Sequence, residues 1–161
     1  AILTRGNPRD PGARKIDTNE VAKLFALMEE DIRRGRWQGY GFLPKLLHAK
    51  DIVLRQTALD IFQNHTYHLP CQAGRTAGVL MPEGDVYACE LWEKPIGNLR
   101  QFQYNFPALW QSDTAMKIRE EILKTRCTCY HQCFLSNTLF WNLKAWLKIM
   151  SEWVRIDQQK D

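Results

Sequence analysis

The chain has 161 residues, of which 45% are hydrophobic and 25% are charged. These values are typical of a soluble globular protein with one core, or with one small domain and a further fragment. The net charge of +4 is mild, and basic and acidic residues are mixed along the chain, so we expect no nucleic-acid partner. Without a long apolar run or a signal-peptide pattern, we expect a cytoplasmic protein with no membrane partner.

The first residues predict the end of a strand followed by a loop. "AILTRG" is apolar at its start, and "NPRDPG" is rich in residues that favour turns. Such a strand would pair with neighbours upstream, so we expect the chain to be part of a longer protein.

Two helices are predicted before residue 65. The first covers residues 17–36, because Asp17 or Thr18 can cap it and apolar residues then recur at helical spacing. The second runs from Leu46 to about Asn64. The histidines near its ends are more readily explained as surface residues than as metal ligands: His48, His65 and His68.

At Pro70 the pattern changes from helical to extended. Residues 78–81 and 86–89 predict the two strands of a hairpin, with a turn in which Gly84 can adopt a positive φ. This hairpin would fold the chain back so that Cys71 and Cys89 can approach each other. Gly97 and Asn98 predict another turn.

Helices are predicted again after this region. A short one covers residues 105–111, and another runs to about Lys124 from a cap at Ser112 or Asp113. A last helix is expected over residues 135–156. Its apolar positions predict one buried face, which three tryptophans widen: Phe140, Leu143, Leu147, Met150 and Val154, with Trp141, Trp146 and Trp153.

All five cysteines lie within one stretch of the chain. They form a C-x12-G-x4-C pattern and a C-x-C-x3-C pattern: Cys71 and Cys89, then Cys127, Cys129 and Cys133. An odd, clustered set is unlike a secreted disulfide framework and fits reduced thiolates that bind a soft metal. Structural zinc sites usually show C-x2-C pairs, so these wider spacings favour a 4Fe–4S cluster over zinc, which stays an alternative.

These residues resemble the C-terminal region of radical S-adenosylmethionine enzymes that carry a SPASM or twitch auxiliary-cluster domain. The family pattern opens with C-x(9–15)-G-x4-C, which Cys71, Gly84 and Cys89 match in this chain. "IGNL" and "FPALWQS" resemble the segments that follow, and Cys129 and Cys133 fit the last C-x3-C step. "ILTRGNPRDP" resembles the last barrel strand and its loop.

The resemblance implies one auxiliary 4Fe–4S cluster, because five thiols cannot supply the roughly eight ligands of two clusters. Cys71, Cys89 and Cys133 would be ligands, and the fourth would be Cys129 or Cys127. It also implies an α+β fold, with residues 1–66 as a remnant of a partial (β/α) barrel with linking helices. Residues 67–161 would form the SPASM/twitch-like domain, a small hairpin and cysteine loops with a C-terminal helix.

The implied function is that of one part of a radical S-adenosylmethionine oxidoreductase or maturase. The auxiliary cluster would transfer electrons or position a peptide or small-molecule substrate beside the radical site. S-adenosylmethionine and a second 4Fe–4S cluster would bind an N-terminal barrel of the same protein, since no C-x3-C-x2-C motif is present here. We therefore expect this chain alone to be inactive. Arg5, at the end of a barrel strand, could face the active site.

Two other functions remain open. One is a module in which zinc joins the hairpin to the C-x-C-x3-C loop for protein or peptide recognition. The other is a thiol-based redox protein, which is the weaker reading because no C-x-x-C motif is present.

Overall fold

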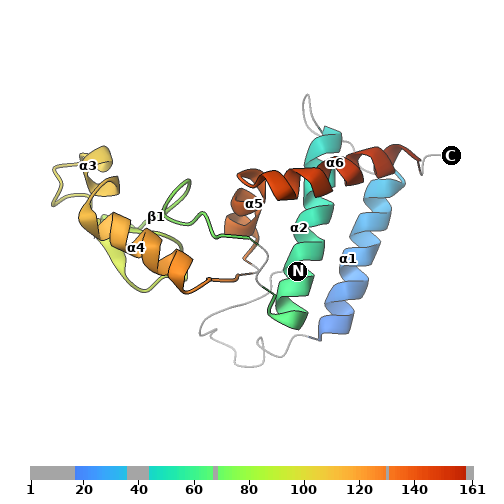
Figure 1. Ribbon diagram of the computed structural model, residues 1–161, viewed down its shortest axis with the longest axis horizontal. Coiled ribbons are helices and arrows are strands. Elements are labelled where there is room, and N and C mark those ends of the chain that lie inside the picture. The colour runs from blue at the N-terminus through green and yellow to red at the C-terminus, as the bar shows by residue number, and fades with distance from the viewer. Residues whose placement is uncertain (1–16, 36–43, 67–68, 130, 159–161) are drawn as a thin grey trace. The chain divides into compact units, whose positions relative to one another are not determined.

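The computed structural model describes residues 17–35, 44–66, 69–129 and 131–158. It is helix-rich with a small antiparallel sheet, which confirms the predicted α+β class (Figure 1). Packing divides the chain into two compact units. The helical unit comprises residues 1–69 and 128–161, and the sheet unit comprises residues 70–127.

The first two helices of the helical unit form where the sequence predicts them. α1 covers Thr18–Arg33, and the Asp17 side chain caps it by accepting a hydrogen bond from the Asn19 N–H at 2.8 Å. α2 covers Pro44–Asn64 and packs against α1. The two helices lie side by side in Figure 1.

The predicted last helix is two helices, because the chain breaks after residue 140. α5 covers Gln132–Phe140 and α6 covers Leu143–Gln158. Asn142 starts the second helix, since its side-chain oxygen accepts hydrogen bonds from the N–H groups of Lys144 and Ala145 at 3.0 and 3.3 Å. An asparagine that caps a helix in this way favours a new start over a continuous helix.

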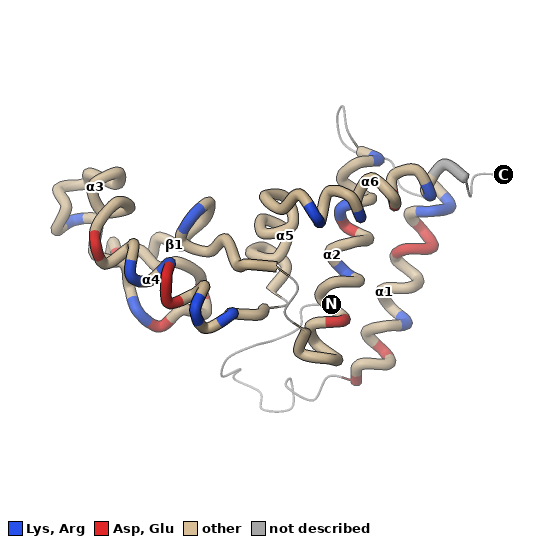
Figure 2. The backbone as a smooth tube through the Cα atoms, in the orientation of Figure 1, with Lys and Arg blue, Asp and Glu red and all other residues tan. Residues whose placement is uncertain are grey.

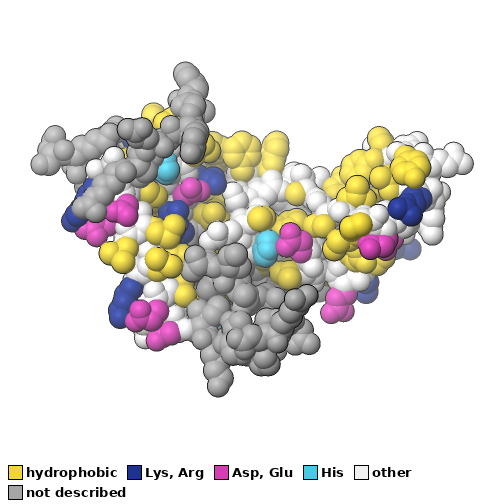
Figure 3. Space-filling model, turned by 180° about the vertical axis from the view of Figure 1, so that it is seen from behind, with side chains coloured by type: hydrophobic (Ala, Val, Ile, Leu, Met, Phe, Trp, Pro, Cys, Tyr) yellow, Lys and Arg dark blue, Asp and Glu magenta, His cyan; other side chains and the backbone are white. Residues whose placement is uncertain are grey.

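The predicted buried face of this last segment is wrong. The residues that α6 buries are Ala145, Ile149, Glu152 and Ile156. The residues expected inside are largely outside, with Leu143 81% and Leu147 70% exposed. Small and β-branched residues let α6 pack closely on α2, its main partner. Hydrophobic side chains are accordingly visible at the surface of the helical unit in Figure 3.

The core of the helical unit joins residues from all four helices, with α2 at its centre. The N-terminal end of α1 adds a smaller cluster around Val21 and Phe25. The main core consists of Ile32, Ala49, Ile52, Val53, Leu54, Ala58, Ile61, Leu135, Leu139, Ala145, Ile149 and Ile156.

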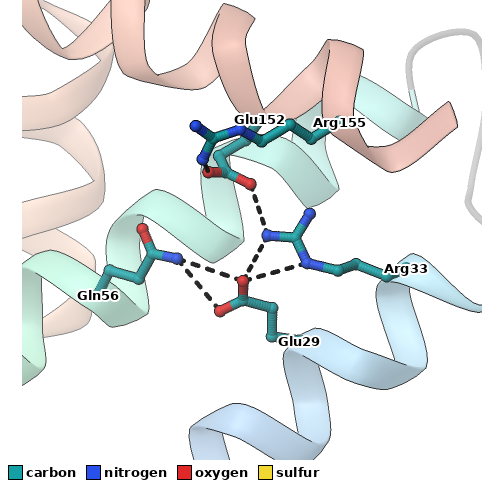
Figure 4. Close-up of polar contacts among 5 residues, drawn as sticks. All are labelled: Glu29, Arg33, Gln56, Glu152 and Arg155. Atoms are coloured by element: carbon teal, nitrogen blue, oxygen red, sulfur yellow. Dashed lines mark hydrogen bonds and ion pairs between the residues drawn. The ribbon is translucent and has the colours of Figure 1, made fainter. Parts of the chain in front are cut away.

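A buried ion pair holds α6 against α1 (Figure 4). Glu152, whose side chain is 7% exposed, accepts hydrogen bonds from Arg33 at 2.6 Å and from Arg155 at 2.9 Å. Arg33 also contacts Glu29, which accepts from the side-chain amide of Gln56 at 3.2 Å. Burial alone would lower the pKa of the Arg33 guanidinium, but its bonds to Glu29 and Glu152 outweigh burial and raise that pKa.

The sheet unit begins with the predicted hairpin. β1 covers Val79–Leu80 and β2 covers Asp85–Tyr87, and the two pair in antiparallel register. Gly84 lies in the turn with a φ of +93°, a conformation that residues other than glycine rarely adopt. The turn closes with a hydrogen bond from the Gly84 N–H to the Met81 carbonyl at 2.9 Å.

The turn predicted at residues 97–98 is wrong, because both residues belong to a third strand. β3 covers Pro95–Asn98 and pairs with β2, giving the order β1-β2-β3. The Asn98 side chain does act as in a turn, since its oxygen accepts from the Arg100 N–H at 3.0 Å. Pairing with β2 overrides the local turn preference of the Gly-Asn pair.

Two helices complete the sheet unit as predicted. α3 covers Phe106–Trp110 and α4 covers Asp113–Lys124, and Ser112 caps α4 through a hydrogen bond from the Ala115 N–H at 3.2 Å. Both helices pack on β3. The buried core of this unit consists of Ala73, Val86, Ala88, Ile96, Leu109, Ala115, Ile118 and Ile122.

The predicted domain boundary between residues 66 and 67 stays a prediction. α5 and α6 belong to the same compact unit as α1 and α2, and buried residues of all four helices share one core. Basic and acidic residues are interspersed along α1, α2 and α4 (Figure 2), whereas α3 and α5 contain none. None of the described helices combines the length and apolar character needed to cross a membrane.

We expect Glu152→Ala to lower the free energy of unfolding of the helical unit by about 2–4 kcal/mol, because it removes a buried carboxylate from two arginines. Chemical denaturation followed by circular dichroism measures this change. Lys23→Ala, which breaks the exposed pair of Lys23 with Glu20, is the control and should change stability by less than about 1 kcal/mol. Equal effects of the two variants would contradict this account of the network.

Candidate metal centre

Cys71 opens the sheet unit in a tight loop. Its side chain is partly buried, and its Sγ accepts a hydrogen bond from the Ala73 N–H at 3.5 Å. Ala73 and Ala77 form an isolated bridge, and the N–H groups of Arg75 and Thr76 both donate to the Gln72 carbonyl. These contacts define the backbone conformation of the loop that follows Cys71.

The peptide groups of Gly74 join this loop to the hairpin. The Gly74 N–H donates to the carbonyls of Ala77 at 2.8 Å and Ala88 at 3.1 Å. Gly74 has a φ of +71°, and a Cβ placed there would lie 3.1 Å from the Cβ of Ala88. Because Ala88 immediately precedes Cys89, this contact holds the residue beside one cysteine against the loop that follows the other.

Cys89 lies just after β2 and is also partly buried. A turn follows it, closed by a hydrogen bond from the Trp92 N–H to the Cys89 carbonyl at 3.2 Å. The indole Nε1 of Trp92 is buried and has no hydrogen-bond partner among the described residues. A buried, unpaired N–H near a cysteine is a donor that a sulfur acceptor could satisfy.

Cys127 follows the end of α4. Its N–H donates to the Ile122 carbonyl at 3.3 Å, and its side chain is partly buried. α4 is fixed to the Cys71 loop by Arg119, whose Nε donates to the Gly74 carbonyl at 2.5 Å. The same guanidinium donates to the Trp110 carbonyl at 2.5 Å and lies 5.1 Å from the centre of the Trp110 ring.

The other two cysteines belong to the helical unit. The Sγ of Cys129 accepts a hydrogen bond from the His131 N–H at 3.2 Å. Cys133 lies in the first turn of α5 and is exposed. Backbone N–H donation to sulfur, seen at Cys71 and Cys129, stabilises thiolates and is a feature that tunes iron–sulfur centres.

None of the five cysteines, all of which lie in the described part of the chain, forms a disulfide bond. Among the described residues, no three His, Cys, Asp or Glu side chains lie close enough to share one metal ion. Within the sheet unit, the structure brings the Cys71 loop to the residue preceding Cys89. The donor set fits an iron–sulfur cluster chemically, because all five donors are thiols, two of them accept backbone hydrogen bonds and a buried N–H donor lies close to Cys89 in sequence.

Arg5, the strand expected at residues 1–6 and His68 lie outside the described residues. His65 is exposed at the end of α2, and burial lowers the pKa of His48 within that helix. Sequence reasoning missed Arg119, and it interpreted Trp92 only as an aromatic residue of the core or of the shielding around a cluster. Arg119 follows Ile118 on the buried side of a predicted helix, and this was the only available sign of its role.

The comparison with known families agrees with this chemistry. Residues 71–134 match the family model of SPASM, an iron–sulfur cluster-binding domain. The matched segment contains all five cysteines, so it confirms that this part of the chain carries an iron–sulfur-binding domain of the predicted type. No curated protein and no solved structure matches the chain.

Gly74→Ala should destabilise the sheet unit by about 1–3 kcal/mol, because alanine strains a positive φ and its Cβ crowds Ala88. Hydrogen exchange of peptides from residues 70–127 measures this loss. Gly97→Ala is the matched control, since its Cβ would meet only movable side-chain atoms, the nearest on Phe102 at 3.3 Å. Protection that stays at the wild-type level in Gly74→Ala would refute the role of this glycine.

Proposed function

We propose that residues 71–133 bind one auxiliary 4Fe–4S cluster of a radical S-adenosylmethionine enzyme. The observation that carries this proposal is the match of residues 71–134 to an iron–sulfur cluster-binding domain found in such enzymes. The five cysteines of that segment, none of which forms a disulfide, supply enough ligands for one cluster. S-adenosylmethionine and the radical-forming cluster would bind residues beyond this sequence, in a barrel of the same protein.

The proposed ligands are Cys71, Cys89 and Cys133, with either Cys127 or Cys129 as the fourth. When bound, such a cluster supplies a one-electron donor or acceptor. Four thiolate ligands leave no iron open, so we propose electron transfer as its role in preference to direct binding of substrate. A peptide or small molecule remains the proposed substrate class of the whole enzyme.

The residues around the sheet-unit cysteines would exclude water and supply hydrogen bonds. The Ala73 N–H already donates to Cys71, and the unpaired Trp92 indole N–H could donate to a sulfur near Cys89. Such donors favour the more negatively charged, reduced state of a cluster and so raise its reduction potential. The buried Ala73 and Ala88 flank this region with apolar surface.

We expect Cys71→Ala and Cys89→Ala to lose most of the bound iron and sulfide, because each removes one of the proposed thiolate ligands of the cluster. Iron and sulfide analysis with electron paramagnetic resonance, on protein prepared without oxygen, measures the loss. Met116→Ala, at an exposed position of α4, is the control. Separate replacement of Cys127 and Cys129 identifies which of the two is a ligand.

Two results would contradict the proposal. Full iron content and an unchanged spectrum in Cys71→Ala or Cys89→Ala would show that the ligand assignment is wrong. A colourless wild-type protein with stoichiometric zinc would instead support the structural zinc module.

A further inference from the structure

Arg119 is not a proposed ligand, but its hydrogen bonds place it beside the loop that carries Cys71. It is a partly buried cation on α4, and both of its hydrogen bonds go to backbone carbonyls, not to a carboxylate. Burial, followed by repulsion from Arg75, lowers the pKa of its guanidinium. A charge that is partly buried and bonded to two backbone carbonyls indicates a specific structural role for this guanidinium.

The acceptor at one end of the guanidinium is the Gly74 carbonyl, three residues after Cys71. The acceptor at the other end is the Trp110 carbonyl at the end of α3, and the Trp110 ring lies beside the same guanidinium. Trp110 in turn packs against Gly78, where even a Cβ would come within 2.8 Å of the ring. Arg119 therefore joins the Cys71 loop, α3 and α4 at one point.

Gly74 links the loop that Arg119 holds to the residue next to Cys89. Its carbonyl is held by Arg119, while its N–H is held by the Ala88 carbonyl next to Cys89. The bonds fix the peptide units on both sides of Gly74, which is only three residues after Cys71. The loop cannot rotate away from the hairpin without breaking at least one of these bonds.

We propose that Arg119 is a positioning residue, which holds the Cys71 loop against Ala88 so that Cys71 and Cys89 are ordered before a cluster binds. The inference rests on the proposed iron–sulfur function, and it adds a residue that is not itself a ligand. An ordered pair of thiols lowers the entropic cost of ligation and slows loss of the metal. Residues that orient ligands in this way change metal affinity by about 10–100-fold when replaced.

The test compares Arg119→Gln and Arg119→Lys with Lys117→Gln, an exposed position on the same helix. In the metal-free full chain, alkylation of Cys71 by iodoacetamide is followed by mass spectrometry of its peptide. We expect Cys71 to react faster in Arg119→Gln, with an intermediate rate in Arg119→Lys, because lysine can donate to one carbonyl but cannot bridge both. Lys117→Gln should react like the wild type.

After anaerobic reconstitution, release of iron to a chelator provides the second measurement. Arg119→Gln should release iron about 10–100-fold faster than the wild type, with the lysine variant between them. If Arg119→Gln matches the wild type in both the rate of Cys71 alkylation and the rate of iron release, the proposal is overturned. Should Arg119→Gln unfold by circular dichroism, the folded Arg119→Lys variant decides by the same two rates.

The alkylation measurement separates this inference from the proposed function. If the wild-type chain binds no iron, the iron–sulfur proposal fails. Faster alkylation of Cys71 in the arginine variants would still support the role of Arg119 in ordering the loop. If the wild type binds iron while Cys71 reacts equally in all variants, the proposed function stands and the role of Arg119 is refuted.

Discussion

The sheet unit depends on the peptide groups around one glycine. Gly74 donates to Ala77 and Ala88 and accepts from Arg119, so a turn, a strand end and a helix all meet at this residue. Its positive φ and its 3.1 Å clearance from the Ala88 Cβ explain why a side chain would not fit there. With only nine residues assigned to strands, the sheet itself supplies few backbone bonds. Hydrogen bonds such as those of Gly74, which link a loop, a strand end and a helix, therefore contribute much to the structural order of the unit.

The elements with local signals were predictable from sequence, and those decided by packing were not. Asp17 and Ser112 predicted the starts of α1 and α4, because both are residue types that cap helices. Gly84 predicted the turn between β1 and β2. At Gly97 the local signal predicted the wrong structure. The Gly-Asn pair is typical of turns, but Gly97 lies in a strand because it pairs with Val86. Pairing between strands is a non-local interaction that a short window of sequence does not contain.

The last helix shows how composition can mislead about burial. Its largest apolar side chains suggested the buried face, yet α6 presents Ala145, Ile149 and Ile156 to the core and leaves Leu143 exposed. Glu152 lies on the buried face because two arginines neutralise it there. Sequence periodicity detects an apolar stripe, but it does not reveal that a second stripe with smaller residues fits α2 better.

The chemistry of the candidate site was predictable from the sequence, but the residues that position its ligands were not. Spacing of the cysteines favoured an iron–sulfur cluster over zinc, and the resemblance of these residues to the SPASM family predicted the type of domain, with which the family match over residues 71–134 agrees. Nothing in the spacing indicated that Arg119, thirty residues beyond Cys89, would bond to the loop after Cys71. The reason is general: metal ligands must be of a few residue types, whereas a backbone carbonyl can be held by any donor that the fold brings near. Positioning residues of this kind are found by examining the hydrogen bonds of the loops that carry the ligands. In the loop after Cys71, the carbonyl of Gly74 accepts a hydrogen bond from Arg119.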